Sequence, residues 1–128
     1  MTYDTAPKID RGFSDLMAET GRTLVVIYYS GHGLMDPNGS FKTCAELNQT
    51  VTSSDPNSSK LHLVYYPLQE AIELLAKKSN LFVFGILECC RAVLPPSLKG
   101  DYSRHTPRWF DSLSGQPTEG SWILFHAL

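Results

Sequence analysis

Residues 23–33 have the sequence TLVVIYYSGHG, an unbroken run of β-branched and aromatic residues that ends in two glycines around His32. An apolar run without alternation is typical of a strand that is covered on both faces, as in a parallel sheet. The two glycines predict a tight turn or a close approach of the backbone where the strand ends. We therefore expect a buried parallel strand over residues 23–29 that delivers His32 at its carboxyl end.

A second run of this kind, LFVFGIL, occupies residues 81–87 and leads directly into Glu88, Cys89, Cys90 and Arg91. The segments around the two runs alternate between helical and strand patterns, which indicates an α/β fold with parallel main strands. The predicted elements are helices over residues 9–19 and 67–78, strands over residues 23–29, 61–66, 81–87 and 121–128, and polar connections over residues 36–60 and 95–120.

Size and composition narrow the function classes. A chain of 128 residues with 42% hydrophobic residues suits one domain over residues 1–128. The net charge of -2 and the scattered basic residues argue against a nucleic-acid partner. No apolar stretch reaches the roughly 20 residues of a membrane span, and residues 1–11 contain no signal-peptide core. We expect a cytoplasmic protein whose three cysteines are free thiols.

The chemistry is expected where the two main strands end, because ligand sites of open parallel sheets form beyond the carboxyl ends of the strands. One strand delivers His32 and the other delivers Cys90, 90 − 32 = 58 residues further along the chain. An imidazolium beside a thiol stabilises the thiolate, which is the active nucleophile, and the same imidazole can protonate a departing amine. The backbone N–H groups of Gly33 and Cys90 are the expected donors to an oxyanion.

The motifs YYSGHG at residues 28–33 and LECCRA at residues 87–92 resemble those of the caspase, metacaspase and paracaspase superfamily of cysteine peptidases. In caspases a histidine precedes the cysteine signature by about 50 residues. The resemblance covers residues 9–91 and, more loosely, the strand around Trp122. It implies a caspase-like, mostly parallel sheet flanked by helices, incomplete and close to the large-subunit core, with the chain truncated at both ends.

By position, the resemblance implies that His32 is the catalytic histidine and that Cys90, which precedes Arg91, is the nucleophile of a cysteine endopeptidase. Cys89 points to the opposite side of the strand, so we expect it to be a small core residue. Caspases have Gln at position 88, whereas metacaspases have an Asp that binds basic P1 side chains. Glu88 therefore predicts a metacaspase-like preference for Arg or Lys at P1 in a protein or peptide substrate.

No cofactor or metal is expected. Some metacaspases bind calcium through acidic loops, and Asp36 is the residue that such a site would use, although a solvated loop carboxylate is the simpler interpretation. A zinc site would have to combine His32, Cys44, Cys89 and Cys90, whose spacing lacks the usual C-x₂₋₄-C pair.

The alternative function is a non-catalytic caspase-like scaffold, a regulatory module or an inactive fragment. In that case His32 is a turn residue, Cys90 an inert thiol and Glu88 a partner in a local salt bridge. The family's first strands and its strand after residue 128 are missing from this chain, so we expect either a dimer or a partner that supplies the missing strands.

Overall fold

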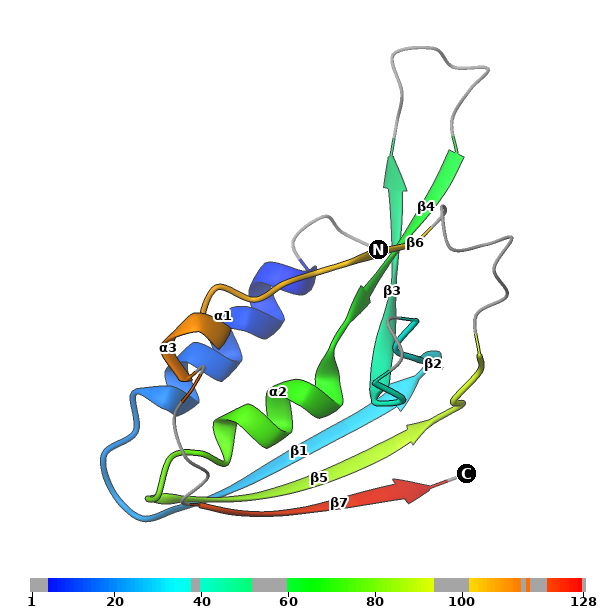
Figure 1. The fold of residues 1–128 in the computed structure, drawn as a ribbon. Coiled ribbons are helices and arrows are strands. Elements are labelled where there is room, and N and C mark those ends of the chain that lie inside the picture. The colour runs from blue at the N-terminus through cyan, green and yellow to red at the C-terminus, as the bar shows by residue number, and fades with distance from the viewer. Residues whose placement is uncertain are drawn as a thin grey trace.

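The computed structural model describes residues 5–37, 40–51, 60–93, 102–113, 115 and 120–127, except for the side chains of residues 48–51 and 60–62. These residues form a mixed α/β fold with two sheets (Figure 1). The elements in chain order are α1 (Thr5–Met17), β1 (Thr23–Gly31), β2 (Gly33–Met35), β3 (Thr43–Val51), β4 (Lys60–Tyr66), α2 (Leu68–Leu75), β5 (Leu81–Cys89), β6 (Tyr102–Arg104), α3 (Phe110–Leu113) and β7 (Ser121–Ala127).

The first sheet has the strand order β1-β5-β7 and is parallel throughout, as the two apolar runs and the helix between them predict. Figure 1 shows all three strands running in the same direction, with the helices on one side of them. Helix α2 rests directly on the central strand, because a Cβ added at Gly85 would come within 2.9 Å of the Cδ1 atom of Ile72. This close contact aligns the central strand, which ends at Cys89, under the helix.

The second sheet has the order β2-β3-β4-β6 and lies beside the carboxyl ends of the first (Figure 1). Strands β3 and β4 pair antiparallel, whereas β4 and β6 pair parallel. The prediction of a loop over residues 36–60 is therefore wrong, since Thr43–Val51 forms a nine-residue strand. Cys44, Ala45 and Leu47 of that strand are buried, so tertiary packing outweighs the polar composition of the segment.

The main core lies between the helices and the first sheet. It contains Ile72 and Leu75 of α2 together with Val83 and Leu87 of β5, all fully buried. Phe13 of α1 stacks on the indole of Trp109 with ring centroids 5.0 Å apart. This stacking holds the chain segment around α3 against α1.

The helices differ from their predicted limits at both ends. Helix α1 begins at Thr5 and ends at Met17, and α2 ends at Leu75, before the predicted Lys78. The Lys78 ammonium donates hydrogen bonds to the carbonyl oxygens of Met17 and Glu19 instead. It thereby satisfies carbonyl groups at the end of α1, which lack partners within that helix.

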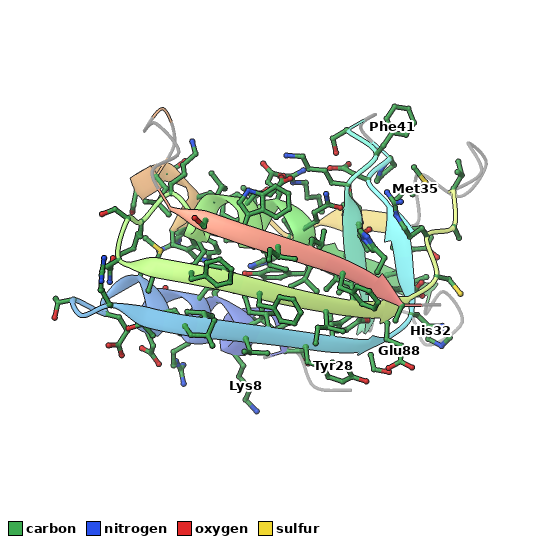
Figure 2. The ribbon with its side chains drawn as sticks, turned by 90° about the horizontal axis from the view of Figure 1, so that it is seen from below. Lys8, Tyr28, His32, Met35, Phe41 and Glu88 are labelled. Atoms are coloured by element: carbon green, nitrogen blue, oxygen red, sulfur yellow. The ribbon has the colours of Figure 1, made fainter. Side chains whose placement is uncertain are left out.

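The first sheet is covered on one face only, which corrects the expectation that both faces are buried. Along β1 the odd-numbered residues from Thr23 to Tyr29 are buried or half-buried, whereas Leu24, Val26 and Tyr28 are exposed. Figure 2 looks onto this open face, and the helices lie behind the sheet. Among the described residues, no helix is long and apolar enough to span a membrane.

Candidate active site

His32 and Cys90 follow the carboxyl ends of two adjacent parallel strands. Strands β1 and β5 are hydrogen-bonded neighbours, and their register pairs Gly31 with Cys89. His32 and Cys90 are the next residues on the two strands, so their backbones leave the sheet side by side. Both residues are exposed to solvent.

Gly33 lies against the chain around Cys90. A Cβ added at Gly33 would come within 2.5 Å of the Cys90 carbonyl oxygen and 2.7 Å of the Cys89 Sγ atom. Real Cβ atoms do not approach other atoms so closely, so only glycine fits this position without a shift. The segments after Gly33 and after Cys90 also contact each other, because the Met35 N–H donates a 2.9 Å hydrogen bond to the Ala92 carbonyl.

The backbone of His32 is held by two hydrogen bonds to its carbonyl oxygen. The Tyr29 hydroxyl donates one at 2.6 Å, and the backbone N–H of Glu46 donates the other at 2.9 Å. Burial raises the pKa of Tyr29, so its hydroxyl stays protonated and can donate over the physiological pH range. The histidine therefore sits on a turn that is tied both to its own strand and to β3.

His32 and Cys90 follow adjacent strands. In the part of the chain that the structure describes, no hydrogen bond joins the imidazole of His32 to the thiol of Cys90. Figure 2 shows the His32 side chain at the carboxyl end of the sheet, beyond the body of the molecule. Catalytic hydrogen bonds are often long or poorly aligned before substrate binds. The register of the two strands places the backbones of His32 and Cys90 next to each other.

The other two cysteines are buried. Cys89 belongs to the main core, as its alternation with Cys90 predicts, and burial raises the pKa of its thiol. Burial raises the pKa of Cys44 to about 12, with a further contribution from the charge of Asp36. Cys90 is therefore the exposed thiol of the three, and its thiolate is the one that solvent can reach.

Glu88 lies on the open face of the sheet, two residues before Cys90. Its carboxylate accepts a hydrogen bond from the Tyr28 hydroxyl, which extends from the neighbouring strand (Figure 2). This hydrogen bond raises the pKa of Tyr28. The alternative interpretation of Glu88 is a local salt bridge, whereas the contact that the structure describes is a hydrogen bond from a tyrosine, and the carboxylate is exposed.

Asp36 is buried, which overturns its description as a solvated loop carboxylate. It pairs with the Arg104 guanidinium at 3.0 Å, and the same guanidinium contacts Glu70 at 2.7 Å. Ser40 donates a further hydrogen bond to Asp36 at 3.1 Å. The ion pair with Arg104 already compensates the carboxylate charge that a calcium ion would need.

The two other histidines whose side chains the structure describes each contact a polar side chain. His105 lies 2.6 Å from Asp10, and His126 lies 2.9 Å from the Thr43 hydroxyl. Burial, and to a lesser degree the charge of Arg91, lower the pKa of His126. The His62 side chain lies outside the described residues. Within the described ranges no group of three or more His, Cys, Asp or Glu residues could hold a metal ion.

Two residues of this region were not singled out by the sequence. Tyr28 and Tyr29 contact Glu88 and the His32 backbone, respectively. They follow each other in the YYSGHG motif and alternate between the two faces of the sheet, so strand alternation could have assigned one tyrosine to each face.

Comparisons with known proteins found no match among protein-family models, curated proteins or solved structures.

Proposed function

We propose that this chain is the catalytic part of a cysteine endopeptidase that uses His32 and Cys90. The observation that carries the proposal is the register of β1 and β5, which sets the two residues side by side at the carboxyl edge of a parallel sheet. The exposure of Cys90 supports it, since Cys44 and Cys89 are buried. Three free thiols suit a reducing compartment such as the cytosol.

In the proposed reaction, the Cys90 thiolate attacks the peptide carbonyl carbon and forms a C–S bond, while the carbonyl electron pair moves onto oxygen. The N–H groups of Gly33 and Cys90 donate to that oxyanion. When the C–N bond breaks, the His32 imidazolium gives its proton to the leaving amine. The neutral imidazole then takes a proton from water, whose oxygen attacks the thioester carbonyl; the C–S bond breaks, the carboxylic acid product leaves, and the Cys90 thiolate and His32 imidazolium are restored.

The proposed specificity is for Arg or Lys at P1, recognised by Glu88. The carboxylate is exposed, close in sequence to Cys90 and oriented by the Tyr28 hydroxyl. A charge-assisted hydrogen bond from a guanidinium is stronger than one from a neutral phenol, so the substrate can displace Tyr28 from Glu88. An aspartate at P1 would be repelled by the same carboxylate.

The test is hydrolysis of two fluorogenic peptides that differ only in Arg or Asp at P1, with and without calcium. We expect cleavage after Arg that Cys90→Ala abolishes and Cys89→Ala retains. Glu88→Gln should lower kcat/KM for the Arg peptide by about a hundredfold, the cost of removing one partner of a close charge pair. Cleavage after Asp that Glu88→Gln leaves unchanged would contradict the proposed P1 specificity. It would not contradict the assignment of His32 and Cys90 as the catalytic residues.

A second candidate is a non-catalytic module of the same fold. It is favoured by one observation: no hydrogen bond joins the imidazole of His32 to the thiol of Cys90 in the described part of the chain. If a chain shown to be folded by circular dichroism hydrolyses neither peptide, this candidate is favoured over the peptidase.

A further inference from the structure

The open face of the first sheet is a continuous apolar surface. The even-numbered side chains of β1 and β5 and the odd-numbered ones of β7 share this face, because the registers pair Leu24 with Phe82 and Phe82 with Ser121. Its most exposed apolar members, between 39% and 65% accessible, are Leu24, Val26, Tyr28, Phe82, Ile123 and Phe125. We call this set the open-face patch.

The patch is large for a surface that stays in water. A large side chain presents on the order of 200 Å² when fully exposed, so six that are about half exposed present roughly 600 Å². A monomer rarely leaves a contiguous apolar patch larger than a few hundred Å² exposed. The area approaches the roughly 800 Å² that each partner buries in a stable interface.

Charges lie at opposite ends of the patch. Arg22 lines a surface hollow together with Leu24 and Phe82, where the strands begin. Glu88 lies on the same face where β5 ends. Within the described residues Arg22 makes no ion pair, and the interaction of Glu88 is the hydrogen bond from Tyr28.

We propose that the open-face patch packs against the same patch of a second copy of this chain, with the strands of the two sheets antiparallel. Two sheets pack face to face about 10 Å apart when both present apolar side chains. A two-fold axis perpendicular to the strands brings Arg22 of each copy to the end where the other copy carries Glu88. An axis along the strands would bring like charges together instead, so charge complementarity selects the antiparallel arrangement.

This dimer completes what the parallel sheet lacks. Parallel sheets occur almost only with both faces covered, and α1 and α2 cover one face here. In the dimer, the β1-β5-β7 sheet of the other copy covers the open face. The arrangement uses Glu88 at the interface, so a second copy and a basic peptide side chain exclude each other at this carboxylate.

The test is sedimentation velocity of the purified chain over a concentration series from low micromolar upwards. We expect a monomer–dimer equilibrium that Val26→Lys weakens at least tenfold, because the lysine would be buried between two sheets. Val93→Lys is the matched control, since Val93 is also exposed but lies outside the patch. Both substitutions are at exposed sites, so circular dichroism should show the same folded monomer.

Charge reversal tests the orientation independently of catalysis. Arg22→Glu and Glu88→Arg should each weaken the dimer about tenfold, and the double reversal should restore it. A monomer at every concentration, open-ended aggregates, or a dimer that Val26→Lys leaves unchanged would overturn the proposal. A dimer that both single reversals leave intact would overturn the antiparallel arrangement.

Discussion

The Tyr29 hydroxyl donates a 2.6 Å hydrogen bond to the carbonyl oxygen of His32, three residues further along the chain. The tyrosine ring lies on the helix-covered side of the sheet and packs against the main core, so the hydrogen bond connects the core to the turn that carries the imidazole. The position of the proposed catalytic histidine therefore depends on a half-buried residue of the strand before it.

Tyr29→Phe should lower kcat/KM about tenfold while it costs only about 1 kcal/mol of folding free energy. The ring keeps its packing, and the Glu46 N–H still donates to the His32 carbonyl, so the fold survives while the turn loosens. Steady-state kinetics and urea unfolding measure the two effects. Unchanged kinetics would show that the hydrogen bond does not position His32.

Gly33→Ala should destabilise the chain by about 1–3 kcal/mol, because the added Cβ collides with the Cys90 backbone and the Cys89 side chain. The matched control is Gly21→Ala, where no atom lies within 4 Å of the added Cβ. Reduced backbone entropy in the unfolded state makes that control neutral or slightly stabilising. Equal urea midpoints for the two variants would contradict the close approach at Gly33.

Arg104→Met should cost about 2–3 kcal/mol of stability, because it leaves the buried Asp36 carboxylate without its cation. The estimate is below that of a fully buried pair, since Arg104 and Glu70 are partly exposed. Arg108→Met is the control, an exposed arginine of the same segment that should change stability by less than about 0.5 kcal/mol. Similar losses in both variants would mean that the ion pair stabilises nothing.

Thiol alkylation should modify Cys90 before Cys44 and Cys89. At about pH 8 the raised pKa values of Cys44 and Cys89 leave little thiolate at those sites, and burial blocks the reagent as well. Peptide mass spectrometry after iodoacetamide treatment should show Cys90 modified about a hundredfold faster than either of them. In denaturant the three rates should converge, and equally fast modification of Cys89 in the folded chain would refute this burial pattern.

The parallel sheet could be predicted because its strands are continuous apolar runs separated by a helix. Strand β3 could not, because its sequence TCAELNQTV is polar overall and its strand state depends on pairing with β4. The predicted burial of both sheet faces fails for a related reason. An apolar run has the same sequence whether its outer face is covered within the chain or by something else, so Val26 and Val25 look alike before the helices are placed.

For the candidate site, too, some features could be predicted from the sequence and others could not. Local motifs were sufficient to select His32, Gly33, Glu88 and Cys90 as candidates. Contacts that depend on strand register could not be predicted from the sequence. One example is the hydrogen bond from Tyr28 to Glu88, which are 60 residues apart. The pairing of Asp36 with Arg104 spans 68 residues and joins two segments that were both expected to be loops.

The most direct test of the proposed peptidase is covalent trapping by a peptidyl-arginine acyloxymethyl ketone, a thiol-specific electrophile that requires an oriented nucleophile. The mass spectrum of the intact chain should show a single adduct, and fragmentation should place it on Cys90. His32→Ala should slow the labelling at least about a hundredfold, since general-base assistance contributes that much. A folded chain that takes up no adduct, or that is labelled at the same rate with and without His32, would contradict the assignment of these two residues as a catalytic pair.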